Sequence, residues 1–140
     1  MKKAKIQGQT LDLVEIVAGR PKIESCGGYA IFEGIVRNHN HGKKVSKLEY
    51  TCYEPLALKE LNKILDEANE KFGTRFIEIV HRVGDLAIGE PAVFIHALTS
   101  HRREAFGACE YVIDELKKRV PIWKKEFYTD GTIDWPRCQH

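Results

Sequence analysis

The spacing of apolar residues along the chain predicts short strands interrupted by helices. Side chains alternate between two faces in a strand, whereas one face of a helix repeats every three or four residues. Beyond a short N-terminal strand, these patterns predict strands over 29–37, 47–53, 75–83, 92–99 and from Ile122 onward. Helical spacing predicts a modest helix over 11–18, a long helix from Pro55 to Phe72, and a second long helix over 101–119.

The order of these elements indicates the fold class. Two long helices mixed with strands that follow one another through short connections predict an α+β fold, with the helices packed on one mostly antiparallel sheet. The polar stretch 38–44 predicts a mobile loop, and the stretch 84–90 predicts a turn between two strands. From about Thr129 onward, we expect a loose tail.

Composition narrows the class of protein. A chain of 140 residues with 43% hydrophobic content predicts a single domain over 1–140. Its net charge of +2 argues against a protein that mainly coats nucleic acid. Four cysteines without a CxxC pair, and an N-terminus without the apolar run of a signal peptide, predict a reduced cytoplasmic protein. No apolar run reaches the length of a membrane span, so we expect no membrane association.

The segment KKRVPIWKKE at 117–126 gathers five cations around a proline and a tryptophan. Pro121 lacks an N–H group and disfavours helix at the residue before it, so the helix should end near Arg119. The two lysine pairs therefore belong to different elements. Helical phase places Lys117 beside the apolar stripe, half-buried, and Lys118 on the opposite face.

Beyond the proline, strand alternation places Lys124 on the same face as Ile122 and Glu126. Lys125 shares the other face with Trp123 and Phe127. A simpler interpretation is that basic residues end a helix because they complement its negative C-terminal end. That interpretation explains Lys118 and Arg119 about as well as an anion site does, but it does not explain the lysines after the proline.

A second group of cations, His101-Arg102-Arg103, lies in the first turn of a predicted helix, after the capping candidates Thr99 and Ser100. Positive charge is unfavourable there, whereas the free backbone N–H groups favour an anion. A bound phosphate or carboxylate would reconcile these facts. For His101 and Arg102 we favour such a site; for Arg103 we favour a surface ion pair, for example with Glu104.

Other candidate residues carry weaker signals. Arg37 ends an apolar strand, where its guanidinium could hold a phosphate, although strands often end in a solvated Arg. His39 and His41 suggest a metal by their spacing, but no cysteine or carboxylate lies nearby at ligand spacing, so loop histidines are the better interpretation. Similarly, we expect His81 and His96 to be hydrogen-bonded strand histidines. Phe32 and Trp123 could stack a heterocycle, but core packing is favoured for each.

Four ordered blocks resemble one family. These are GIVRNHN at 34–40, EIVHRVGDLAIGE at 78–90, TSHRREAF at 99–106 and KKRVPIWKKE at 117–126. Over roughly 28–128 the chain resembles the large, catalytic subunit of molybdopterin synthase. The resemblance implies an α/β hammerhead fold and a homodimer that binds two small ubiquitin-like sulfur-carrier subunits, giving a heterotetramer. The carrier's C-terminal Gly-Gly thiocarboxylate would supply sulfur to cyclic pyranopterin monophosphate, twice, forming the dithiolene of molybdopterin. No metal or redox cofactor is implied.

The resemblance also implies roles for individual residues. By position, Lys117 and Lys124 match the family's catalytic lysines. Substrate binding is implied for Ile35, Val36, Arg37, His101, Arg102, Lys117, Lys124, Lys125 and Glu126, with the backbone of Ile35 and Val36 taking part. His101 and Arg102 would serve the site of the neighbouring large subunit. Repulsion between two ammonium groups in a partly dry pocket favours the neutral form of one of them. Lys117 would then accept a proton or act as nucleophile while Lys124 stays charged.

Two alternatives from other classes remain open. The basic clusters, with Trp123 and Phe32 as stacking faces, could belong to an RNA-binding module. The small net charge and the lack of an RNP-type motif count against this, and a salt-sensitive shift with oligonucleotides would support it. The chain could also be a non-catalytic adaptor that binds a ubiquitin-like protein. Carrier binding without pterin conversion would indicate the adaptor.

Overall fold

The computed structural model describes residues 1–136, and their helices and strands follow the predicted order with three additional short strands. The elements are β1 (Lys2–Gln7), α1 (Leu13–Ala18), β2 (Gly28–Ile35), β3 (His39–Asn40), β4 (Lys43–Cys52), α2 (Glu54–Phe72), β5 (Phe76–Arg82), β6 (Gly84–Ala87), β7 (Pro91–Thr99), α3 (Arg102–Arg119), β8 (Ile122–Tyr128) and β9 (Ile133–Asp134). None of the helices in this part of the chain is long and apolar enough to cross a membrane.

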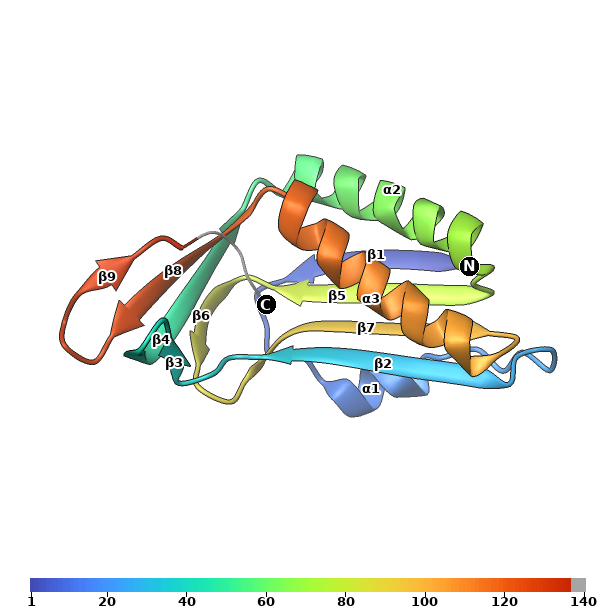
Figure 1. Ribbon diagram of the computed structural model, residues 1–140, viewed down its shortest axis with the longest axis horizontal. Helices are drawn as coiled ribbons and strands as arrows, with labels where there is room; N and C mark the ends of the chain where they lie inside the picture. Colours follow the sequence, from blue (N-terminus) through green and yellow to red (C-terminus); the bar gives the residue numbers. More distant parts are fainter. Residues whose placement is uncertain (137–140) are drawn as a thin grey trace.

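The first sheet carries the two long helices on one face. Its strand order is β1-β5-β7-β2, with β1 parallel to β5 and the other neighbours antiparallel. Figure 1 shows α2 and α3 lying side by side on one face, while α1 lies on the other. Alternate residues of the central strands, such as Ile79 and Ile95, pack with the apolar stripes of both helices in the main core. The predicted α+β class, with long helices on a mostly antiparallel sheet, is confirmed.

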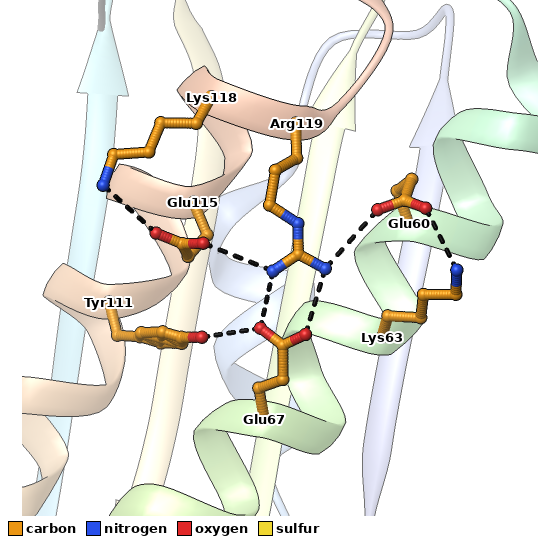
Figure 2. Close-up of polar contacts among 7 residues, drawn as sticks. All are labelled: Glu60, Lys63, Glu67, Tyr111, Glu115, Lys118 and Arg119. Carbon is orange, nitrogen blue, oxygen red and sulfur yellow. Dashed lines mark hydrogen bonds and ion pairs between the residues drawn. The ribbon is translucent and has the colours of Figure 1, made fainter.

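The C-terminal end of α3 is tied to α2 by Arg119. Its guanidinium contacts both carboxylate oxygens of Glu67, at 2.6 and 3.0 Å, and also reaches Glu60 and Glu115 (Figure 2). Hydrogen bonds from Arg119 and from the Tyr111 hydroxyl lower the pKa of Glu67. Because Arg119 is engaged in these ion pairs, its role at the helix end is structural, and its partners are carboxylates of α2 and α3.

A second sheet projects from one end of the first (Figure 1). It has the strand order β3-β4-β8-β9, and β6 also pairs with β4. The sequence predicted a single sheet, and this expectation was wrong because β3, β4, β6, β8 and β9 pair among themselves rather than with the first sheet. The chain passes between the two sheets several times, the last time at Pro121. There α3 ends, and the extended backbone of Val120 leads β8 away from the first sheet to pair with β4. The stretch 84–90, predicted as a turn, contains β6.

The stretch predicted as a mobile loop is a tight hairpin. Asn40 pairs with Lys43 across two residues, His41 and Gly42, with φ values of 50° and 80°. Left-handed φ values at both central positions are what a type I′ turn requires, and such turns match the twist of paired strands. The polar composition hid this hairpin because a histidine stands where asparagine is usual. Likewise, the tail predicted to be loose from Thr129 turns at Gly131 and forms β9 against β8; residues 137–140 lie outside the described part.

Candidate active site

A small pocket of about 60 Å³ lies where β2 ends against the second sheet. Its lining comes from four strands and the segment after β2: Gly34, Ile35, Val36, Arg37, Leu48, Tyr50, Ala92, Lys124 and Glu126. The structure thus brings together five of the residues expected to bind substrate, from two regions far apart in the sequence. The pocket combines an apolar wall with two cations and one carboxylate.

Lys124 is almost entirely buried, with 5% of the residue exposed. Its Nζ lies 3.9 Å from Oε2 of Glu126, which is equally buried. The other carboxylate oxygen of Glu126 accepts hydrogen bonds from Asn40 Nδ2 at 2.7 Å and from the Tyr128 hydroxyl at 2.9 Å. A buried charge is costly unless it is paired. Glu126, held by these two donors, therefore stabilises the Lys124 ammonium group inside the pocket. Burial alternates along β8, which confirms the predicted face for Lys124.

Arg37 lies at the exposed rim of this pocket. Its Nη2 donates to Oδ1 of Asn40 at 3.4 Å. The neighbouring backbone is already engaged, since the N–H of Val36 donates to Glu90 O and its C=O accepts from Gly89. An anion that used the Val36 N–H would have to displace this bond. The Arg37 guanidinium is thus the accessible cation of this segment.

Lys117 lies on α3, half-buried as predicted, and lines a different hollow. That hollow, of about 310 Å³, runs between α3 and β2, and its apolar wall includes Phe32, Phe106 and Ile113. The sequence analysis expected both lysines in a single pocket, whereas in this chain each lines its own. Lys118 points away, with 70% of its side chain exposed and an ion pair to Glu115.

His101 and Arg102 lie at the other end of α3, far from the small pocket. His101, rather than Thr99 or Ser100, is the N-cap residue, and both His101 and Arg102 are exposed. Gly28 approaches this helix start so closely that a Cβ would lie 2.7 Å from the Arg102 nitrogen. Figure 1 shows α3 beginning at the end of the first sheet that is opposite the second sheet. Within one chain, these residues do not join Lys124.

The sequence and structure have clear relatives. The family model described as MoaE protein matches residues 6–119. The chain belongs to the MoaE family. It is 46% identical over 107 residues to a molybdopterin synthase catalytic subunit of Pyrococcus abyssi, an alignment covering 76% of this chain and 72% of the relative. It is 42% identical over 112 residues to the bovine protein of the same name, covering 80% and 59%.

Solved structures agree with this assignment. The molybdopterin synthase structure from Staphylococcus aureus matches with a TM-score of 0.85 at 40% identity, covering 96% of each chain. A complex of subunits 1 and 2 of molybdopterin-converting factor from Helicobacter pylori matches with a TM-score of 0.74 at 23% identity, covering 96% and 90%, and shows the shared fold. The family that the four sequence blocks predicted is therefore confirmed.

The MoaE family resemblance assigned no role to the strand histidines, and the structure shows how they are satisfied. His81 Nδ1 donates to the Arg82 carbonyl, and complete burial lowers the pKa of His81 to about 4. His96 lies 2.6 Å from the Tyr29 hydroxyl and 2.7 Å from a Glu78 oxygen. Both predictions are confirmed. Within residues 1–136, no cluster of three or more His, Cys, Asp or Glu side chains could hold a metal ion.

Other expectations require correction or refinement. Phe32 packs against the core as predicted, but Trp123 is 51% exposed, because it lies on the outer face of the second sheet. Lys125 shares that face and lies over the rings of Phe127 and Trp135. Sequence analysis also missed Asn40 and Tyr128, which lie outside the pocket lining but hold the Glu126 carboxylate. Neither residue stands out by type, since Asn40 lies in a polar hairpin and Tyr128 at a strand end. Tyr128 is two residues from Glu126 on β8, whereas Asn40 reaches Glu126 only because β3 pairs with β4 and β4 pairs with β8.

Proposed function

We propose that the chain is a molybdopterin synthase catalytic subunit that acts as a sulfurtransferase. It would transfer sulfur from the thiocarboxylate of a small ubiquitin-like carrier to cyclic pyranopterin monophosphate, in two steps that form the dithiolene. The observation that carries the proposal is a buried lysine, Lys124, beside a solvent-facing Arg37, in a member of the MoaE family. The cytoplasm is the proposed location, where half-buried thiols such as Cys26 and Cys52 stay reduced.

The chemistry of the pocket suits this reaction. The carrier thiocarboxylate and the substrate phosphate are both anions, and cations hold anions more strongly where water is excluded. In our proposal Lys124, kept charged by Glu126, stabilises negative charge in the pocket, and Arg37 holds the phosphorylated substrate at the rim. Lys117 is the proposed proton acceptor or nucleophile. Its place in the last turn of α3, half-buried beside an apolar hollow, supports this assignment.

The two lysines need to approach the same substrate, although each lines its own hollow. We propose that the carrier tail and the pterin together bridge these hollows. His101 and Arg102 would complete the anion site of a second large subunit within a homodimer, and with two carriers the assembly is a heterotetramer. The Helicobacter pylori complex of two converting-factor subunits supports a partner subunit for this fold.

The deciding experiment mixes the purified chain with thiocarboxylated carrier and cyclic pyranopterin monophosphate and measures dithiolene product. Lys117→Ala and Lys124→Ala should lose product formation. Lys118→Ala is the matched control, because its exposed side chain points away from both hollows. Carrier binding without any product would identify a non-catalytic adaptor instead. Equal loss in the Lys118 variant would contradict the assignment of Lys117.

A further inference from the structure

One continuous chain of polar contacts joins the rim of the small pocket to its buried lysine. Arg37 Nη2 donates to Asn40 Oδ1 at 3.4 Å, and Asn40 Nδ2 donates to Glu126 Oε1 at 2.7 Å. Glu126 Oε2 in turn lies 3.9 Å from Lys124 Nζ. Asn40 is the link between the two cations, and it comes from a hairpin outside the pocket lining.

The amide of Asn40 suits the chemistry of this link. A guanidinium only donates hydrogen bonds and an ionised carboxylate only accepts them. The residue between Arg37 and Glu126 must therefore accept on one side and donate on the other, which fixes the orientation of the Asn40 side chain. Aspartate could still accept from Arg37, but its carboxylate would repel that of Glu126. An aliphatic side chain could do neither.

The surroundings hold Asn40 in place. Only 5% of the residue is exposed, and it lies immediately before the two-residue turn that joins β3 to β4. Tyr128, two residues after Glu126 on the same strand β8, donates to the same carboxylate oxygen. The Glu126 carboxylate is thus held by two neutral donors, which leaves its second oxygen directed at Lys124.

We propose that Asn40 is a positioning residue that couples substrate binding at Arg37 to the placement of Lys124. Binding of an anion at Arg37 would change its contact with Asn40. Through Glu126, that change would alter the position of the Lys124 ammonium group. This inference rests on the proposed function for the part that concerns catalysis. The contact chain itself is a property of the free protein and has its own test.

The kinetic test distinguishes the Arg37 end of this series of contacts from the Lys124 end. Asn40→Asp keeps an acceptor for Arg37 but removes the donor to Glu126. We expect kcat to fall by about 10-fold or more, with KM for the pterin within about 2-fold of wild type. Tyr128→Phe removes the other donor and should lower kcat by a smaller factor, again with little change in KM. Asn38→Ala, at an exposed position two residues earlier, is the matched control and should behave as wild type.

A second measurement does not depend on activity. Amine acylation followed by peptide mass spectrometry reports how well Lys124 is held, and exposed Lys43 in the same hairpin serves as internal reference. Labelling of Lys124 should be faster in Asn40→Asp and Asn40→Ala than in wild type, with Lys43 unchanged. If wild type makes no dithiolene, the proposed function fails. The labelling rates would still show whether Asn40 positions Lys124. Unchanged kcat in an active background, or unchanged Lys124 labelling in both variants, would overturn the inference.

Discussion

Arg102 begins α3 and Lys117 lies in its last turn, so the two residues stand at opposite ends of one rigid helix. Fifteen residues separate them, which corresponds to roughly 22 Å along the axis at the usual helical rise. The two side chains of one chain therefore do not meet, and they line different parts of the surface. This separation supports the arrangement that the family resemblance implies, in which Arg102 serves the site of the neighbouring large subunit.

This geometry predicts complementation between inactive variants. Arg102→Ala and Lys117→Ala should each lose activity as homodimers, but mixing them should restore part of it, since one interface in the mixed dimer carries an intact set. The measurement is product formation after subunit exchange, compared with each variant alone. No recovery after demonstrated exchange would mean that Arg102 does not serve the neighbour's site.

Removal of Arg102 should affect function and stability in opposite directions. A cation in the first turn of a helix is electrostatically unfavourable, so Arg102→Ala should leave the free energy of unfolding unchanged or raise it by at most about 1 kcal/mol. The same substitution should weaken binding of the phosphorylated substrate. Denaturant unfolding and the KM for the pterin test the two parts. A clear loss of stability would show that Arg102 has a structural role instead.

The cysteines should be dispensable for sulfur transfer. Cys109 is buried, its thiol donates to the Ala30 carbonyl at 3.6 Å, and burial raises its pKa to about 12, so the reactive thiolate is scarce at neutral pH. Replacing Cys26, Cys52, Cys109 and Cys138, the last of which lies outside the described residues, should lower stability mainly through Cys109. The folded fraction should keep its activity. A persulfide trapped on any of the four during turnover would contradict a supply of sulfur from the partner alone.

The Glu67–Arg119 ion pair should stabilise the protein in a pH-dependent way. Because the pKa of Glu67 is lowered in the folded protein, the contribution is fully present above the ordinary value of 4.5 and is lost as pH falls through the lowered value. Glu67→Gln should cost about 1 kcal/mol at pH 7, a modest amount because 35% of the side chain is exposed and water screens the pair. The cost should shrink in acid. Urea unfolding at several pH values measures it, with the exposed Glu70→Gln as control.

The turn at His41 provides a test of the hairpin. A β-branched residue is strained at a positive φ, so His41→Val should destabilise the protein by about 1–2 kcal/mol. Asparagine tolerates this conformation, and His41→Asn should be neutral or slightly stabilising. Chemical denaturation of both variants gives the comparison. Equal stability of the two would indicate that residues 38–44 are mobile, as their composition alone suggested.

The amino-acid sequence by itself determined most elements and the family. Periodicity is a local property, and it placed α2, α3 and the longer strands, the break at Pro121, and the opposite directions of Lys117 and Lys118. Four ordered motifs determined the MoaE assignment. These features depend on neighbours within a few residues along the chain, so they can be deduced without knowing what packs against them.

Only the tertiary structure decided how these pieces meet. The division into two sheets, the separate hollows of Lys117 and Lys124, and the placement of Asn40 against Glu126 depend on strand pairing between distant segments. Asn40 and Glu126 are 86 residues apart. Polar composition predicted solvent for Asn40, whereas a tight turn and the β4–β8 pairing bury it beside a carboxylate that needs a donor. Burial of a polar group depends on the partner that the fold supplies, and no local pattern records that partner.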